Sequence, residues 1–495
     1  MSATLIEPAG SLAERTARGV FWTFALRIAD RGVSLVRTIV LARLLAPDDF
    51  GVMGVALLML SGLEVVTMTG FDAALIQKKG RIESYLDAAW AAQFIRGLLL
   101  AIVLFLAAPL VAIFFEEPRV TLVLQVLALS ELIKGCQSIG IVYFHKDLEF
   151  HKEFAYRFTN TIVKLAVSIP AALILRDALA LVIGVVIGDV VSCLMSYALH
   201  PYRPRLRFEW DKMKELFGFG KWILGSSLLT FLCNQGDDVF LGKMLGPATL
   251  GLYQMAYLIS NLPATEITHV AARVSFPAYA KLQDSLDKLR EMHLAVLRLV
   301  ALVSVPLATG ILLFARDVTA LLLGPKWEPM VPAMQLLVFW GLMRSVGAPI
   351  GSLLQASGRL RVHTRLQLTK FLLLAICIYP MTKAWGMTGT ALAVVVHTLP
   401  IEVYVHYLAV RLLRSPVVPY LQSLLFPLLA SSIMFLAVWT LKMLIFQSVS
   451  VIGLVVLVVI GWLTYAAVIG LLEFCFQYGL RDIVSRVLAK PLQQG

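Results

Sequence analysis

The sequence is short of charge. Only 15% of its 495 residues are Asp, Glu, Lys or Arg, and 59% are hydrophobic, whereas a soluble domain carries about 25% charged residues. Apolar stretches of roughly 20 residues recur along the whole chain, and each is long enough to span a hydrocarbon core of ~30 Å. No region has the composition of an independent soluble domain. The sequence therefore predicts an all-α polytopic membrane protein.

Sequence signatures of catalysis are also scarce. The chain has no GxxxxGKS/T phosphate loop, no HExxH motif, and no nucleophile elbow with a partnered histidine. Its five cysteines are neither paired by spacing nor grouped with histidines, so neither a disulfide framework nor a metal site is expected. We expect no enzyme and no cofactor. The net charge of +12 does not indicate a nucleic acid partner, because the basic residues lie in short loops between apolar spans.

About fourteen membrane spans are predicted. Their ranges are 18–44, 50–76, 87–115, 120–144, 155–176, 178–199, 214–244, 249–275, 290–315, 330–355, 367–385, 387–411, 419–446 and 450–477. With the N-terminus inside, the cytoplasmic connections hold roughly three times as many Lys and Arg residues as the outer ones. This bias is the positive-inside pattern of a multi-pass inner-membrane protein and predicts that both termini are cytoplasmic.

The sequence contains a weak duplication. Residues 41–56, LARLLAPDDFGVMGVA, align without a gap on residues 241–256, LGKMLGPATLGLYQMA, and pair Pro47 with Pro247 and Gly51 with Gly251. Each copy is predicted to form a helix end, a turn and a new helix start. Because six spans separate the copies, they form parallel repeats. We therefore predict an N-terminal six-helix lobe over 1–210, a second six-helix lobe over 211–412, and two further helices with a cytoplasmic tail over 413–495.

The first span carries a polar stripe. Projected at 100° per residue, Arg27, Asp30, Arg31 and Arg37 lie on one arc of the helix. A central charge costs about 2.5–3.5 kcal/mol in lipid, so this face must look into a wet cavity or at partners inside the bundle. Two interpretations stay open. In one, the arginines pair with Asp30; in the other, the stripe lines a central substrate cavity, which fits the excess of cations.

The seventh span repeats the stripe with acidic residues. Asn234, Asp237 and Asp238 occupy positions equivalent to Ser34, Arg37 and Thr38. We add Asn234 and Asp237 to the predicted substrate site, with Asp237 as an alternating partner of Arg37. The candidates for coupling to H+ or Na+ are Asp189, Asp238 and Glu266. Other polar residues fall within predicted spans, namely Arg96, Glu131, Lys134, Arg157, Lys164, His269, Arg298, Arg344, Lys370, His397 and Glu402.

Several separated motifs resemble one transporter family. LARLLAPDDFGVMGVA, FDAALIQKKG (71–80), LGPATLGLYQMAYLISNLP (245–263), RVSFPAYAKLQD (273–284) and LLLGPKWEPMVPAMQLL (321–337) occur in the order seen in polysaccharide exporters. These exporters belong to the multidrug/oligosaccharidyl-lipid/polysaccharide superfamily. The chain resembles its colanic-acid-exporter-like, Wzx-type flippases over nearly its whole length.

The resemblance implies a function and its partners. It implies alternating-access transport of an undecaprenyl-diphosphate-linked oligosaccharide across the bacterial inner membrane, in contact with membrane lipids and with the polysaccharide polymerase machinery. The first-span arginines would suit the diphosphate, because guanidinium groups bind phosphate oxygens in pairs. Two alternatives stay open, a drug/cation antiporter of the same superfamily and a membrane glycosyltransferase or ligase. In the latter, Asp48 and Asp49 would bind a metal, although carboxylates at this position also suit a helix start.

Overall fold

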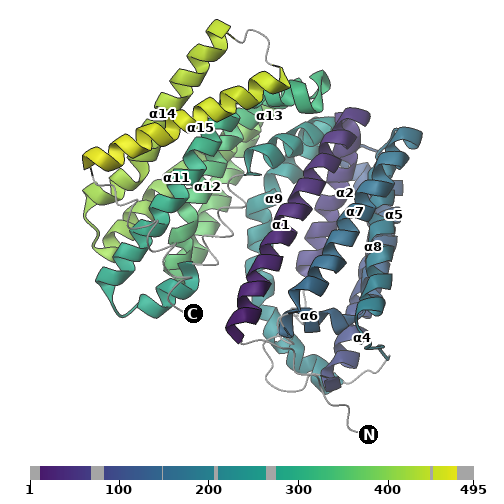
Figure 1. The fold of residues 1–495 in the computed structure, drawn as a ribbon. Coiled ribbons are helices and arrows are strands. Elements are labelled where there is room, and N and C mark those ends of the chain that lie inside the picture. The colour runs from purple at the N-terminus through teal and green to yellow at the C-terminus, as the bar shows by residue number, and fades with distance from the viewer. Residues whose placement is uncertain are drawn as a thin grey trace. The chain divides into compact units, whose positions relative to one another are not determined.

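The computed structural model describes residues 12–67, 83–147, 149–205, 210–262, 275–445 and 450–476. Within these ranges the chain forms helices and short connections, with no strand (Figure 1). The helices are α1 (Leu12–Leu44), α2 (Pro47–Val66), α4 (Glu83–Phe115), α5 (Arg119–Gly135), α6 (Val142–Lys146), α7 (Phe150–Leu175), α8 (Leu179–Leu199), α9 (Trp210–Ser260), α11 (Leu286–Val318), α12 (Val331–Ala356), α13 (Leu360–Leu413), α14 (Val417–Ile445) and α15 (Val451–Phe476). The predicted all-α membrane fold is confirmed.

In the described ranges, nine helices are long and apolar enough to cross a membrane. The nine do not include α1, which carries the charged stripe. Two long helices each cover a pair of predicted spans. Helix α9 is broken at Gly246, whose φ is +82°, and α13 is broken at Trp385 and Gly386. Both breaks fall where the sequence predicts a turn between spans. The number of fourteen crossing segments stays a prediction.

One predicted span ends too late. The span expected over 120–144 ends at Gly135 in α5 and is followed by a 3-10 turn over Ile139–Ile141 and the short α6. Near this end, α5 crosses α4 closely, and a Cβ built on Gly97 would lie 2.7 Å from the Cα of Gly135. The prediction was wrong here because the apolar run continues through residues that form a turn. Paired glycines of this kind let two helix backbones approach closely.

The chain divides into two compact units, Met1–Gly251 and Leu252–Gly495. In the first unit, α1 packs on α7, α7 on α8, and α5 on both α4 and α8. In the second, α12 packs on α11 and α13, and α14 packs on α11 and α15. Trp327 and Met330 are fully buried where α12 begins. The predicted lobes were defined by the sequence repeat rather than by contacts, and they stay a prediction.

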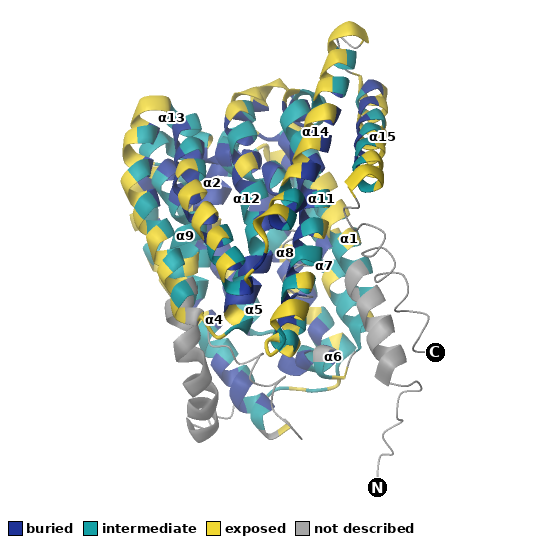
Figure 2. Ribbon diagram, turned by 90° about the vertical axis from the view of Figure 1, so that its left-hand side faces the viewer, coloured by how far each residue is buried: buried dark blue, intermediate teal, exposed yellow. Residues whose placement is uncertain are grey.

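Large apolar side chains are exposed along the second half of α4 and along the length of α14 and α15. On α4 they include Phe105, Leu106 and Ile113, and on α15 they include Ile452 and Leu463. Figure 2 shows exposed residues recurring from end to end of α14 and α15. In water such surfaces would drive association, whereas in a bilayer they are the faces that contact lipid. The exposure pattern thus agrees with the multi-pass assignment.

Candidate functional site

The predicted stripe on α1 is divided between two environments. Asp30 is half-buried and accepts a hydrogen bond from the Thr161 hydroxyl on α7. Arg27 and Arg37 are also half-buried, whereas Arg31 is exposed. Arg37 interacts electrostatically with Asp30, two helical turns away on the same helix. Helix α7 therefore covers part of the stripe and leaves Arg31 accessible.

Asp189 on α8 is the centre of a buried polar cluster. Only 4% of its surface is exposed. It accepts a hydrogen bond from Ser130 on α5 and forms an ion pair with Lys164 on α7, with 3.6 Å between the lysine Nζ and the aspartate Oδ1. Asn160 donates to the Gly188 carbonyl at 2.9 Å and lies 3.5 Å from the Asp189 carboxylate. The carboxylate predicted for ion coupling is thus a hub that joins three helices.

A second charged group joins α2, α4 and α5. Lys134 pairs with Glu131 at 2.7 Å, one turn earlier on α5, and with Glu64 on α2 at 3.6 Å. Arg96 on α4 donates to the Glu64 backbone carbonyl at 3.3 Å and to the Thr67 hydroxyl at 3.2 Å. The side chains of Lys134 and Glu64 are 37% and 39% exposed. Since exposure to lipid would be costly for both charges, this face must look onto water or a polar ligand.

The two groups form one network with the α1 stripe. Lys164 interacts electrostatically with Asp189, and also with Arg37 and Lys134. Cations and carboxylates therefore alternate across α1, α2, α5, α7 and α8. Such a network holds guanidinium and ammonium groups at membrane depth at a lower cost than isolated charges would have. It can present cations to an anionic ligand without leaving them unpaired in its absence.

Helix α9 supplies the acidic counterpart within the first unit. Asp237 is buried, and Asn234 and Asp238 are half-buried. Their neighbour Gln235 accepts a hydrogen bond from Ser61 on α2 at 2.9 Å. Pairing between Arg37 and Asp237 stays a prediction. Glu266, the remaining coupling candidate, lies outside the described residues.

Three polar residues of the candidate site were not predicted from the sequence. Glu64, Ser61 and Gln235 were not singled out, although all three lie in predicted spans. A carboxylate within an apolar run is a functional signal by itself, so Glu64 could have been found. Ser61 and Gln235 could not, because neutral polar residues are common in membrane helices.

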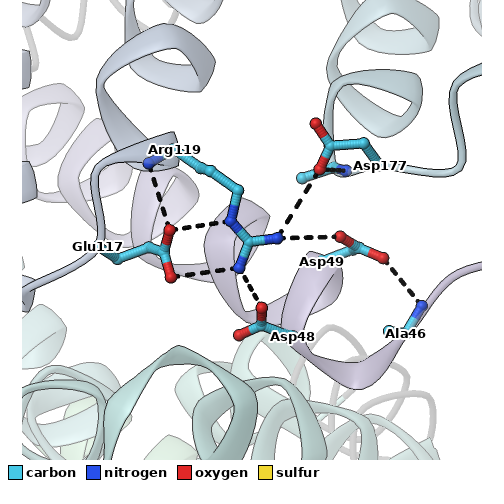
Figure 3. A network of polar contacts seen from close by, with 7 residues as sticks. Ala46, Asp48, Asp49, Glu117, Arg119 and Asp177 are labelled. Carbon is cyan, nitrogen blue, oxygen red and sulfur yellow. Dashed lines mark hydrogen bonds and ion pairs between the residues drawn. The ribbon is translucent and has the colours of Figure 1, made fainter.

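The predicted outer end of the first unit is held together by Arg119 (Figure 3). Its guanidinium forms ion pairs with Asp48, with Asp49 at 3.4 Å and with Glu117 at 2.9 Å, and lies 3.9 Å from Asp177. Asp48 and Asp49 lie at the start of α2, Glu117 lies between α4 and α5, and Asp177 lies between α7 and α8. The bond from Arg119 holds the pKa of Glu117 below its usual range, and the carboxylates raise the pKa of Arg119.

Asp48 and Asp49 lie in the first turn of α2. Asp49 accepts a hydrogen bond from the Ala46 backbone N–H at 2.9 Å, as in a helix-capping interaction. The pair therefore begins a helix, in agreement with the helix-start reading of the sequence. Arg119 occupies the position between these carboxylates where a metal ion would have to bind.

The duplicated turns contact each other. A Cβ built on Gly51 would overlap the carbonyl oxygen of Pro247, and a Cβ built on Gly251 would overlap that of Pro47. Nearby, Lys243 pairs with Glu116 at 2.7 Å, and this hydrogen bond lowers the pKa of Glu116. The local prediction of a helix end, a turn and a helix start is confirmed at both copies. The two glycines allow the two turns to cross with their backbones touching.

The chain is similar to characterised proteins over most of its length. It is 27% identical over 395 residues to the lipopolysaccharide biosynthesis protein WzxC of Escherichia coli (strain K12), covering 79% of this chain and 80% of that protein.

Solved structures with the same fold have low sequence identity. The lipid II flippase MurJ, in an inward closed conformation, has a TM-score of 0.72 at 13% identity, covering 94% of this chain and 100% of that one. A multidrug resistance transporter of the MATE family, facing inward, has a TM-score of 0.61 at 14% identity, covering 77% and 94%. Residues 40–332 match the family described as polysaccharide biosynthesis protein. With more than half of its length matched, the chain belongs to this family of polysaccharide biosynthesis proteins, as the Wzx-like motifs indicated.

Proposed function

We propose that the protein is a flippase for a polyprenyl-diphosphate-linked oligosaccharide in the bacterial inner membrane. The observation that carries the proposal is the charged network at membrane depth, in which Arg37, Lys134 and Lys164 lie close together. A lipid diphosphate brings about two negative charges, and cations bind phosphate oxygens through charge-assisted hydrogen bonds. The fold shared with a lipid II flippase and the similarity to a lipopolysaccharide biosynthesis protein support this substrate class. Polysaccharide polymerases are the partners we expect for this step.

Deletion of the gene should stop polymer production and leave lipid-linked oligosaccharide on the cytoplasmic side of the membrane. The measurement is mass spectrometry of extracted lipid, with a fluorescent lectin that reaches only the outer leaflet of spheroplasts. Purified protein in liposomes should then move the extracted lipid between leaflets. If the purified protein instead transfers sugar from this lipid to an acceptor, it is a glycosyltransferase or ligase. If it moves cationic dyes and not the lipid, it is an antiporter.

Orientation supplies a second prediction. Cysteines introduced for the exposed residues Arg205 and Arg359 should resist an impermeant thiol reagent in intact cells, because the positive-inside bias places both in the cytoplasm. A cysteine at Glu116, whose side chain is 80% exposed, should react. The background lacks the five native cysteines, since Cys475 is exposed. Labelling at Arg205→Cys from outside would reverse the assigned direction of export.

A further inference from the structure

A buried ion pair lies in the second unit, away from the network described above. Lys370 and Glu402 belong to the two halves of α13, and the lysine Nζ lies 2.7 Å from the glutamate Oε1. Glu402 is only 7% exposed, and the Lys370 side chain is 23% exposed. A carboxylate in such surroundings loses most of its hydration, and one ammonium group replaces only part of it.

The second oxygen of this carboxylate lacks a hydrogen-bond partner. Glu402 Oε2 is buried and bonded to no protein donor, although an ionised carboxylate can accept about four hydrogen bonds. Gly347 on α12 faces this oxygen, and a Cβ built on it would overlap Oε2 and lie 3.1 Å from the carboxyl carbon. A side chain at position 347 would therefore clash with this oxygen. The site thus combines a buried, unsatisfied carboxylate oxygen with a glycine packed against it.

Titratable groups surround the pair on the helices packed against it. On α13, His397 interacts electrostatically with Lys370, and His406 with Glu402. From α14, Tyr420 also interacts with Glu402 and shares a hydrogen bond with His406 at 2.7 Å. From α11, the fully buried His293 stacks on Tyr420 with 6.1 Å between ring centroids. From α12, the group in contact is Gly347, which carries no charge.

The chain of rings continues beyond Tyr420. Nδ1 of His293 lies 3.3 Å from the hydroxyl of Tyr279, and its Nε2 has no hydrogen-bond partner. Imidazole and phenol groups in hydrogen-bond contact can each accept and release a proton. Buried polar chains of this kind in membrane helices commonly serve proton movement.

We propose that Glu402 is a proton-binding site, at which a proton on Oε2 replaces the ion pair with Lys370. The proton comes from water, a new O–H bond forms on the carboxylate, and Lys370 keeps its charge and is released. A metal cation fits poorly, because hard cations require several oxygen ligands and Lys370 already holds a positive charge beside the single free oxygen. The proposal rests on the flippase function above, for which it names the coupling ion.

The test separates proton binding from transport. Infrared difference spectra of the purified full-length protein should show a protonated-carboxyl band that appears as the pH is lowered. The band should be absent in Glu402→Gln and present in Glu131→Gln, which alters an equally short ion pair in the first unit. In liposomes, an imposed proton gradient should speed movement of the lipid-linked oligosaccharide by the wild type about tenfold and leave the rate of Glu402→Gln unchanged.

The possible outcomes lead to different conclusions. A band that persists in Glu402→Gln, or no titrating band in the wild type, would refute the proton site. If Glu402→Gln does not fold, the variant Lys370→Gln provides the test, because removing the neighbouring cation should move the band to higher pH. An unmoved band would again refute the site. Wild-type protein that binds the proton yet moves no lipid would refute the flippase function while leaving the proton site in place.

Discussion

Replacing Gly51 by alanine is expected to destabilise the protein by about 1–3 kcal/mol, the usual cost of forcing an extra carbon into a packed site. The added methyl group would overlap the carbonyl oxygen of Pro247, and a backbone atom cannot rotate away as a side chain can. Gly251→Ala should act in the same direction, because its Cβ would overlap the Pro47 carbonyl and lie 2.7 Å from the Gly51 nitrogen. The measurement is the thermal unfolding midpoint of purified protein, followed by tryptophan fluorescence.

Gly236→Ala is the matched control for both substitutions. It lies in α9, and a Cβ there would meet no atom within 4 Å. Alanine inside a helix is favoured over glycine by about 0.5–1 kcal/mol, so this variant should unfold at the same or a higher temperature. If Gly51→Ala has the same unfolding midpoint as the control, the two turns do not touch as described. Because Lys243–Glu116 and the Arg119 cluster lie nearby, we also expect the glycine variants to loosen this whole end of the first unit.

Helix positions were largely predictable because each depends on a local property of the chain. The length of each apolar run sets its span, and the break at Gly246 coincides with a turn signalled by Gly246 and Pro247. The end of α5 was not predictable, because nothing in the run before Gly135 announces the close crossing with Gly97. The duplication identified Pro47 and Pro247 as equivalent. The contact between the two turns depends on how the helices pack, so it could not be predicted from the sequence of either copy.

The candidate site shows the same division between local and long-range information. A helical projection places Asp30 on a polar face, since it needs only the period of the helix. The projection cannot supply Thr161, its hydrogen-bond partner on α7, because partners on other helices are chosen by packing. For the same reason Asp189 and Lys164 were recognised separately as polar residues within spans, and their ion pair was not foreseen. Charges inside membrane spans are therefore easier to find from sequence than to pair.

Arg31→Ala is expected to reduce export ten- to hundredfold while leaving the amount of protein in the membrane nearly normal. Arg31 is the exposed member of the α1 stripe, so its guanidinium is accessible to an anionic ligand. A charge-assisted hydrogen bond to phosphate is worth about 1.5–3 kcal/mol, and each 1.4 kcal/mol is roughly tenfold in affinity or rate. The measurement is polymer output divided by membrane protein level. Ile28→Ala, at a residue 61% exposed on the same helix, is the control and should export normally.

Charge reversal extends this test to the predicted partner on α9. Arg37→Asp and Asp237→Arg should each impair export, because each places like charges together in the network. If the two residues pair during transport, the double variant should export more than either single variant. Residues in contact have non-additive effects in a double-mutant cycle. Equal loss in all three would show that no such pair forms. If Arg31→Ala exports as much polymer as Ile28→Ala, the α1 stripe does not bind the substrate. If the arginine variants are instead lost from the membrane, the charges are needed for folding through their interaction with Asp30.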